Sequence, residues 1–371
     1  MKVVHLIDSG GVYGAEKMLL ALCAEQRRLG LDALVLSARL PAEKGRDIDI
    51  ELRNADIPVI SWPMRAGLSL REMYEINAWA VENQVDVMHA HGYKFNVLVA
   101  STRGRARIKM VTTVHGYTCV NIFSRLMVYD VLDRLSYFAF DRVVYVSPTQ
   151  EQGWLARVVR RSCIPNGVDI RSLPIRGARG RERDGSTGTR LIAVGRLSAE
   201  KDYKLLLDAV SLLKKQHAGV TLSIFGEGPE EAALRRIIVG ERLEGVKLEG
   251  YSNDIVTELC SHDVLVVSSK TEGMPISIME AMCVGLRIAA TAVGGVPLLL
   301  KDYPLAKLVT SRSADELACA IRGHFGDSRS LGEAELARVR ERLSSATMAR
   351  RYVKLYEGLL EFPRRDNGAI T

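Results

Sequence analysis

The chain has 371 residues, too many for one ordinary domain and enough for two, and its 47% apolar residues can fill two hydrophobic cores. The formal net charge of +7 is concentrated in Arg171–Arg190, which contains six arginines and two acidic residues. A nucleic-acid-binding protein would show a broad basic face with interleaved aromatic residues, so we expect no nucleic-acid partner. A local basic excess is equally consistent with contact to an anionic membrane or an anionic substrate.

The cysteines and the first residues indicate where the protein works. No cysteine pair has the Cys-x-x-Cys spacing, which argues against a zinc site and a disulfide framework and favours a reducing cytosol. The cysteines are Cys23, Cys119, Cys163, Cys260, Cys283 and Cys319. The chain opens on a strand-like run, Val3–Ile7, in place of a signal peptide. The longest uncharged stretch, Met110–Ser124, is too short and too polar to span a bilayer, which needs roughly 20 apolar residues. We therefore expect a cytoplasmic protein.

In the first half of the chain, short apolar runs alternate with helical patterns. The expected strands are Val3–Ile7, Ala33–Ser37, Pro58–Trp62, Val85–His89, Met110–Val114 and Arg142–Val146. The expected helices include Ala15–Leu29, Leu70–Glu82 and Arg125–Ala139. Apolar strands that alternate with helices predict a parallel sheet covered by helices on both faces.

The alternation stops at the turn Asn166-Gly167, and Leu173–Thr189 is rich in Arg, Gly, Ser and Thr without periodicity. It then resumes to the end of the chain. The expected strands are Leu191–Val194, Thr221–Phe225, Val246–Leu248, Val264–Val267, Ile288–Val293 and Lys307–Val309. The expected helices are Tyr203–Lys214, Glu230–Val239, Asn253–Cys260, Ala314–Phe325, Glu333–Leu343 and Thr347–Leu360, with another beginning at Pro275.

This pattern predicts an α/β protein with two Rossmann-like, doubly wound domains in tandem and a cleft between them. We expect a first domain over residues 1–169, a basic linker over 170–189, a second domain over 190–345 and a C-terminal helix and tail over 346–371. Ligands of such sheets bind beyond the carboxyl ends of the strands. The loops that come after the strands are therefore the candidate binding segments.

One candidate loop follows the first strand and holds Gly10, Gly11 and Gly14 before the first helix. Glycines at this place allow close approach of backbone to a phosphate or a sugar. The spacing is not Gly-x-Gly-x-x-Gly, and the second strand, Ala33–Ser37, lacks the acidic residue that would hold a ribose. A tight turn is the alternative interpretation.

Two more candidate loops follow strands of the second half. Arg196 and Lys201 lie five residues apart after one strand, so a guanidinium fork and an ammonium can bracket a diphosphate. Gly226 and Gly228 form a glycine turn after the next strand. By itself each loop is consistent with an ordinary solvated connection, but together with the later segment Glu272–Glu280 they favour a nucleotide-diphosphate site.

A later segment, Thr271–Glu280, places two carboxylates around the start of a helix. Pro275 suits a first helical turn, so Glu272 lies in the preceding loop and Glu280 projects from the second turn. The free N–H groups of the first turn form an anion site between them. Acceptors for hydroxyls beside donors for phosphate suit a nucleotide sugar. The alternative is that Glu272 complements the helix dipole and Glu280 is merely solvated.

The histidines supply one further candidate. His115 follows the strand Met110–Val114 at its carboxyl end, where it can bond a sugar hydroxyl or stabilise developing charge. His89 and His91 are spaced as a structural pair at a strand end. No histidine and carboxylate set matches a recognisable metal site.

In this order, the segments resemble the family 4 retaining glycosyltransferases of the GT-B fold. The most specific match is Glu-Gly-x-Pro-x4-Glu-Ala, with Glu272 and Glu280 as its acids. The supporting segments are Gly10-Gly11, His115, Val146-Ser-Pro148, Pro165–Asp169, Arg196 with Lys201, and Gly226-x-Gly-Pro229. The family is typical of cell-surface polysaccharide and lipid-linked glycan synthesis.

The resemblance implies a role for each of these residues. Arg196 and Lys201 would bind the donor diphosphate and stabilise the leaving group, so that a hexosyltransferase of this kind needs no metal or other cofactor. Glu280 would bind the ribose, and Glu272 with the backbone of Gly273, Met274, Pro275 and Ile276 would hold the donor sugar. His115 would lie near the reacting sugar, Gly10, Gly11 and Gly14 would face the acceptor, and the last helix would pack back on the first domain.

Some alternatives stay open on the sequence alone. Nucleotide-sugar 2-epimerases share the fold, and a non-catalytic nucleotide-sugar or glycan-binding protein would keep the cleft. Aromatic and basic residues in Gly153–Arg161 and Phe123–Arg142 suit contact with an anionic membrane and a lipid-linked acceptor. The preferred interpretation is that they are the core faces of two ordinary helices.

Overall fold

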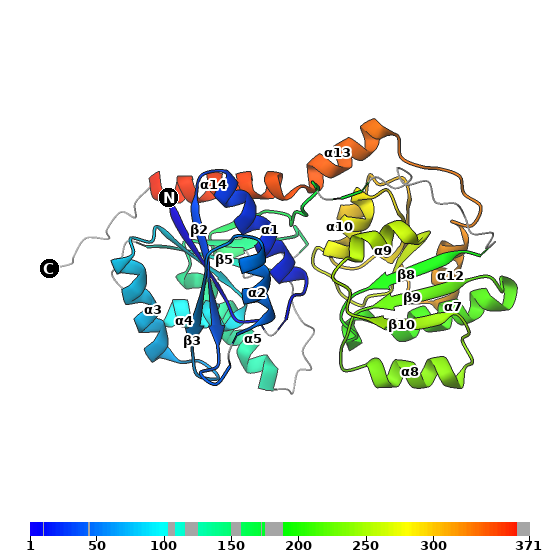
Figure 1. Ribbon diagram of the computed structural model, residues 1–371, viewed down its shortest axis with the longest axis horizontal. Helices are drawn as coiled ribbons and strands as arrows, with labels where there is room; N and C mark the ends of the chain where they lie inside the picture. The colour runs from blue at the N-terminus through cyan, green and yellow to red at the C-terminus, as the bar shows by residue number, and fades with distance from the viewer. Residues whose placement is uncertain are drawn as a thin grey trace. The chain divides into compact units, whose positions relative to one another are not determined.

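The computed structural model describes residues 1–9, 11–43, 45–102, 108–115, 125–149, 157–171, 173–174 and 188–361, without the side chains of 125–127. The chain divides into two compact units (Figure 1). Unit 1 combines Met1–Gly167 with the residues from Ser345 onward, and unit 2 is Val168–Ser344. The predictions at Gly10, at residues 150–156 and at most of the basic linker lie outside the described residues.

Unit 1 contains a seven-stranded parallel sheet in the order β3-β2-β1-β4-β5-β6-β7. Its strands are β1 (Lys2–Ile7), β2 (Asp32–Arg39), β3 (Val59–Pro63), β4 (Val87–His91), β5 (Lys109–Val114), β6 (Arg142–Tyr145) and β7 (Arg161–Cys163). The direction of winding reverses between β1 and β4, which pair in parallel with His5 opposite His89. A switch point of this kind is where doubly wound sheets bind their ligands.

Both faces of this sheet are buried. Leu34 and Leu36 of β2 join one hydrophobic cluster, whereas Val35 between them joins another. Successive side chains of a strand point to opposite faces, so the alternation means that helices cover both sides. The covering helices are α1 (Gly14–Arg28), α2 (Asp47–Asn54), α3 (Leu70–Glu82), α4 (Tyr93–Ser101) and α5 (Arg125–Ser136).

The last helix, α14 (Ser345–Glu361), also belongs to unit 1, as the sequence predicted. It lies beside α1 in Figure 1. Its Tyr352 and Tyr356 are fully buried, and the Tyr356 hydroxyl lies 2.7 Å from His89 Nδ1. The two aromatic rings add buried apolar area. Their hydroxyls need hydrogen-bond partners once buried, so they also fix the position of the helix on the sheet.

Unit 2 contains a six-stranded parallel sheet in the order β10-β9-β8-β11-β12-β13. Its strands are β8 (Arg190–Val194), β9 (Thr221–Phe225), β10 (Val246–Gly250), β11 (Val264–Val267), β12 (Arg287–Thr291) and β13 (Ala306–Val309). Its helices are α7 (Tyr203–Gln216), α8 (Glu231–Gly240), α9 (Ile255–Ser261), α10 (Ile276–Cys283), α11 (Val296–Leu300), α12 (Ala314–Arg322) and α13 (Glu333–Leu343). The winding reverses between β8 and β11. Both units are therefore Rossmann-like.

The structure corrects some local expectations. The strand predicted at Val85–His89 runs from Val87 to His91, because the Val85 N–H still bonds the Ala80 carbonyl at the end of α3. The short helices α2, α4 and α11 were not predicted. Among the described residues, no helix is both long enough and apolar enough to cross a bilayer.

Candidate functional site

The carboxyl edge of the unit 2 sheet brings together the loops that follow β8, β9 and β11. Leu197 N–H donates to the Glu227 carbonyl at 2.9 Å, and Gly195 N–H donates to the Phe225 carbonyl at 3.0 Å. The loop with Arg196 and the glycine turn thus form one backbone-bonded structure. Unit 1 carries Gly11, Gly14 and His115 at the carboxyl ends of its own strands.

The glycines of the β9 loop are required by this packing. A Cβ atom on Gly226 would lie 2.0 Å from the Gly195 carbonyl oxygen, and one on Gly228 would lie 2.4 Å from that of Leu197. Gly226 also has a φ of 138°, which L-residues with side chains avoid. Whatever contact they make with a ligand, these glycines allow the Arg196 loop to take its position.

Lys201 ends the short 3-10 helix η3 (Ala199–Lys201) and is tied to the residues after β11. Ser268 Oγ donates to the Lys201 carbonyl at 2.9 Å, and Lys270 N–H donates to the Glu200 carbonyl at 2.7 Å. The Lys201 ammonium donates to Glu272 Oε1 at 2.6 Å. The order of the loops in the sequence predicts that these two residues share a site, but it does not predict that they pair.

Glu272 is held from several sides. Its Oε1 accepts a second hydrogen bond from Ser269 Oγ at 2.6 Å, and its side chain is only 9% exposed. Gly294 lies against its backbone, since a Cβ there would come within 1.8 Å of the Glu272 carbonyl oxygen. Within the part of the chain that the structure describes, Oε2 takes no hydrogen bond. That oxygen is therefore available to a ligand hydroxyl.

Helix α10 follows this loop. It begins at Ile276, and Pro275 caps it with an extended backbone (φ −69°, ψ 123°), so Pro275 precedes the first turn that was expected to include it. Met274 is buried, and Gly273 and Ile276 are partly exposed. Glu280 projects from the second turn, as the spacing predicted. The first-turn N–H groups of α10 have no partner within the helix and carry its positive dipole end.

Cations and an acid that sequence reasoning missed surround this edge. Asp202 forms ion pairs with Arg312 and, at 3.7 Å, with Lys270. It adopts a left-handed backbone (φ 51°) at the N-cap position of α7, without a side-chain hydrogen bond to that helix. Arg196 is exposed, and no ion pair engages its guanidinium among the described residues. Arg196 is therefore the cation of this loop that is ready for an anion. Its position directly after Lys201 in the sequence could have indicated that Asp202 lies at this edge of the sheet.

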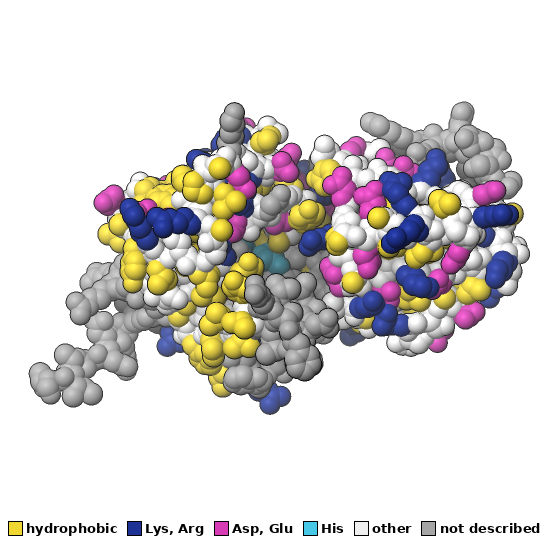
Figure 2. Space-filling model, turned by 90° about the horizontal axis from the view of Figure 1, so that it is seen from below, with side chains coloured by type: hydrophobic (Ala, Val, Ile, Leu, Met, Phe, Trp, Pro, Cys, Tyr) yellow, Lys and Arg dark blue, Asp and Glu magenta, His cyan; other side chains and the backbone are white. Residues whose placement is uncertain are grey.

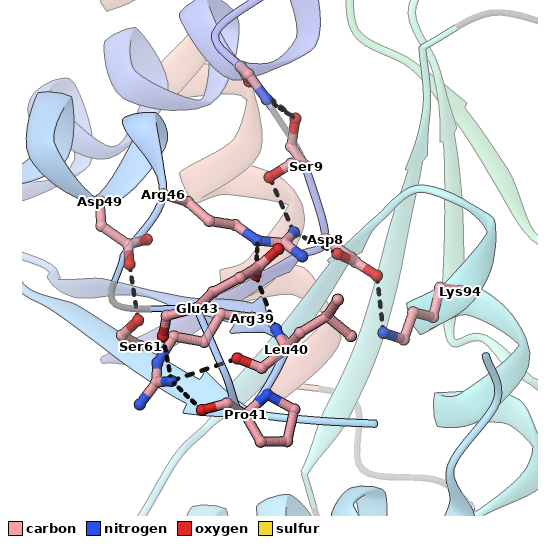
Figure 3. Close-up of polar contacts among 11 residues, drawn as sticks. Asp8, Ser9, Arg39, Leu40, Pro41, Glu43, Arg46, Asp49, Ser61 and Lys94 are labelled. Carbon is pink, nitrogen blue, oxygen red and sulfur yellow. Dashed lines mark hydrogen bonds and ion pairs between the residues drawn. The ribbon is translucent and has the colours of Figure 1, made fainter. Parts of the chain in front are cut away.

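The carboxyl end of β1 in unit 1 carries another ion-pair cluster (Figure 3). Asp8 pairs with Lys94 at 2.8 Å and with Arg46, whose guanidinium also donates to the Ser9 carbonyl at 2.9 Å. Ser9 Oγ donates to the Gly11 carbonyl at 2.9 Å. These contacts shape the loop before α1, whose first residue is Gly14. Asp8 and Lys94 follow strand ends, so the rule that found the other loops would also have found them.

Two groups bear on metal binding. Asp47 and Asp49 have the Asp-x-Asp spacing, but both lie in α2, where Asp47 is exposed and Asp49 is buried and accepts from Ser61 Oγ at 2.7 Å (Figure 3). His5, His89 and His91 lie close enough together to hold an ion. Each of their ring nitrogens has a hydrogen-bond partner in the protein. A metal would have to displace those bonds.

His115 lies at the edge of this histidine cluster. Its Nε2 lies 3.0 Å from His91 Nδ1, and its ring stacks on that of His91 with centroids 5.3 Å apart. Burial lowers the pKa of His115 to about 4 and that of His5 to about 4. It lowers the pKa of His89 and of His91 well below the usual value. All are neutral near pH 7, so His115 offers a hydrogen bond rather than a positive charge.

Comparison with known families agrees with this arrangement. The family model described as Glycosyltransferase Family 4 matches residues 12–172, and the model described as Glycosyl transferases group 1 matches residues 188–327. The chain is 27% identical over 273 residues to WcaL of Salmonella typhimurium, assigned as a colanic acid biosynthesis glycosyltransferase. That match covers 70% of this chain and 66% of WcaL. AmsK of Erwinia amylovora, an amylovoran biosynthesis glycosyltransferase, is 31% identical over 141 residues, which cover 36% of this chain and 35% of AmsK. The chain thus spans less than two thirds of the length of these curated relatives.

Solved structures share the fold over nearly the whole chain. Sucrose-phosphate synthase from Thermosynechococcus elongatus matches with a TM-score of 0.80 at 18% identity, covering 97% of this chain and 100% of that one. Anabaena HepE in complex with UDP and glucose matches with a TM-score of 0.78 at 22% identity, again over 97% and 100%. With its paired Rossmann-like units and both family models matched in order, the chain belongs to glycosyltransferase family 4 and has the GT-B fold.

Proposed function

We propose that the protein is a retaining hexosyltransferase that moves a sugar from a nucleotide-diphosphate sugar to a glycan or lipid-linked acceptor in cell-surface polysaccharide synthesis. The observation that carries this proposal is the carboxyl edge of the unit 2 sheet. There the exposed Arg196, the Lys201–Glu272 pair at 2.6 Å and the start of α10 lie on loops that are bonded to one another or follow neighbouring strands.

The roles follow from the charge that develops during the reaction. Breaking the bond between sugar and phosphate leaves an oxocarbenium-like sugar and additional negative charge on the diphosphate. Arg196 and Lys201 are fixed cations that stabilise that charge as it forms, which is the work a metal ion does in other enzymes. We therefore expect a metal-independent reaction without a cofactor.

The remaining groups bind the uncharged parts of the donor. Glu272 Oε2 accepts a hydrogen bond from a hydroxyl of the transferred sugar, together with the backbone N–H groups of Gly273 to Ile276. Glu280 accepts from the ribose. Gly226 and Gly228 bring backbone close to the diphosphate, and His115 bonds the reacting sugar. Gly10, Gly11 and Gly14 serve the acceptor side.

The names of similar proteins support the substrate classes. HepE binds UDP and glucose in its crystal, and WcaL and AmsK are named for exopolysaccharide synthesis. A nucleotide sugar is thus the donor class that we propose here, and a growing surface glycan is the acceptor class.

An exposed apolar face on unit 1 supports contact with the inner face of the cytoplasmic membrane. Figure 2 shows hydrophobic side chains gathered on that unit. Val128, Val131, Leu132 and Leu135 of α5, followed by Phe138, are 37–59% exposed. Arg157, Arg160 and Arg161 are exposed on the same unit and suit anionic lipid. Tyr137 and Phe140 of the same stretch are buried, so only part of it is core.

The test is a donor screen. The purified chain is mixed with UDP-, GDP- and ADP-sugars, and the thermal midpoint and the slow hydrolysis of each donor are measured with and without EDTA. We expect one nucleotide to raise the midpoint and its sugar to be released as the same anomer in either condition. A response to none of them would overturn the proposal. Formation of an epimerised nucleotide sugar without acceptor would replace it with the epimerase.

A further inference from the structure

Buried polar side chains in unit 1 form one continuous series of hydrogen bonds from α14 to α1. The Tyr352 hydroxyl lies 2.9 Å from Thr113 Oγ1, which lies 2.7 Å from His89 Nε2. His89 Nδ1 lies 2.7 Å from the Tyr356 hydroxyl, and that hydroxyl accepts from the Gln26 amide at 3.5 Å. The residues of this half are fully buried or nearly so.

The same series continues from Gln26 to the strand end. Gln26 Oε1 lies 2.8 Å from His5 Nε2. His5 Nδ1 lies 3.0 Å from His91 Nε2, and His91 Nδ1 lies 3.0 Å from His115 Nε2. The series ends at His115 Nδ1, which is buried and has no partner among the described residues. His115 as a residue is partly exposed, whereas His5, His89 and His91 are buried.

In a series of hydrogen-bonded neutral imidazoles, every bond runs in the same donor-to-acceptor direction. Each donates through one nitrogen and accepts through the other, so the bond at one end sets the tautomer at the next. Gln26 Oε1 can only accept, and therefore the proton of His5 is on Nε2. His5 Nδ1 must then accept from His91 Nε2, and His91 Nδ1 must accept from His115 Nε2. This leaves a lone pair on His115 Nδ1.

The unpartnered His115 Nδ1 supports this direction of the hydrogen bonds, from His115 towards Gln26. Buried N–H groups without a partner are rarer in proteins than buried acceptors without one. In the opposite direction His115 would bury an unpaired N–H, whereas in this direction it buries a lone pair.

We propose that Gln26, His5 and His91 are positioning residues that hold His115 in the Nε2–H tautomer, so that its Nδ1 accepts a hydrogen bond from a hydroxyl of the bound sugar. The inference rests on the proposed function and deepens it. A His115 of this tautomer cannot donate from Nδ1 to a phosphate or a developing negative charge. The sequence left two roles open for His115, a hydrogen bond to a sugar hydroxyl and the stabilisation of developing charge. The hydrogen-bond series favours the first.

The test is ¹⁵N NMR of the histidine side chains in the full chain at pH 7, with signals assigned by single His→Asn variants. We expect Nδ1 of His115 to have the shift of a bare nitrogen and Nε2 of His5, His91 and His115 that of an N–H. Gln26→Met removes the acceptor and should change the tautomer ratio of His115 at least about fivefold. Tyr352→Phe removes a buried hydroxyl at the far end and should leave the ratio unchanged.

The unsubstituted chain keeps the test decisive if Gln26→Met does not fold, because its own shifts report which nitrogen of His115 carries the proton. A protonated Nδ1 on His115 in the unsubstituted chain would overturn the proposal. This readout needs no donor or acceptor. A negative donor screen would therefore count against the proposed function and leave the tautomer result standing.

A titration then links the tautomer to binding. With the nucleotide sugar from the donor screen, His115 Nδ1 should shift on saturation, whereas the free nucleoside diphosphate should leave it unchanged. A shift of equal size with the diphosphate alone would contradict the assignment to a sugar hydroxyl.

Discussion

Lys201 Nζ lies 2.6 Å from Glu272 Oε1, and the two residues come from loops that follow different strands of the unit 2 sheet. The Glu272 side chain is 9% exposed and the Lys201 side chain 23%, so both side chains are largely withdrawn from water. Without a ligand the pair neutralises itself. In the function proposed above, a bound diphosphate would add negative charge beside a lysine that is already oriented, which would remove the cost of ordering that side chain at the moment of binding.

The first prediction concerns the lysine. Lys201→Met should reduce kcat of sugar transfer roughly 100- to 1000-fold, because a fixed cation at the leaving group is lost. Lys204→Met is the matched control. Lys204 lies three residues on, is exposed and pairs with Asp208 within α7, so its loss should change kcat less than about twofold. Equal activity of the two variants would remove Lys201 from the reaction.

The second prediction separates the two partners of the pair. Glu272→Gln keeps the shape and the hydrogen bond to Ser269 but releases the charge of Lys201. The free nucleoside diphosphate should therefore bind about two- to fivefold more tightly, while kcat/KM for the nucleotide sugar falls. Calorimetry and initial rates measure the two effects. Weaker binding of the free diphosphate would mean that Glu272 contacts the nucleotide itself.

A third prediction tests the glycine turn as a packing element. Gly228→Ala places a Cβ 2.4 Å from the Leu197 carbonyl, so it should destabilise unit 2 by about 2 kcal/mol or more. Gly240→Ala is the control, since a Cβ there meets nothing within 4 Å at the end of α8, and it should be neutral or slightly stabilising. Chemical denaturation gives both values. An unchanged unfolding curve for Gly228→Ala would show that the turn can open.

Acid should destabilise unit 1 through its histidines. Their pKa in the unfolded chain is near 6.5, whereas burial lowers the pKa of His5 and His115 to about 4. Between these values the unfolded state binds protons that the folded state does not, so stability falls as the pH drops below 6.5. At pH 5 the loss is on the order of 2 kcal/mol for each of these two groups.

Denaturation at pH 8 and pH 5 measures this loss. His115→Asn removes one titrating group. It should therefore reduce the difference in the free energy of unfolding between pH 8 and pH 5 by the contribution of one histidine. The same pH difference in His115→Asn and the unsubstituted chain would mean that His115 titrates normally.

The fifth prediction concerns the membrane. Val131 and Leu135 lie four residues apart on one face of α5 and are 46% and 55% exposed. Val131→Glu with Leu135→Glu should reduce sedimentation with vesicles that contain anionic lipid, without lowering the thermal midpoint. Val239→Glu, at a 77% exposed site on α8 of unit 2, should leave sedimentation unchanged. Equal binding by both variants would place the lipid contact elsewhere.

Strand ends were predictable because the loop after each apolar run of a parallel sheet must leave from the carboxyl edge. Arg196, Lys201 and Glu272 were found in that way, and all lie in segments that follow strands at one edge of the sheet. The pairing of Lys201 with Glu272 was not predictable, since it joins residues 71 positions apart and depends on the order β8-β11 in the sheet. Sequence spacing also could not show that Gly226 and Gly228 are needed against a neighbouring backbone.

The histidine series lay further beyond the reach of the sequence. His89 and His91 were expected to be structural from their spacing, and both are buried. Their partners His5 and Thr113 come from neighbouring strands, and contact follows only from the register that sets His5 beside His89 and His91 beside Thr113. Gln26 and Tyr356 come from helices 330 residues apart. Tertiary packing alone brings them together.

The place of α14 has a consequence for how the protein is made. Unit 2 is one continuous segment, whereas unit 1 needs residues from both ends of the chain. On the ribosome, the first sheet emerges early, but Thr113 and His89 stay without Tyr352 and Tyr356 until all of unit 2 has been synthesised. Unit 2 can therefore complete its fold before unit 1 acquires its last buried hydroxyls.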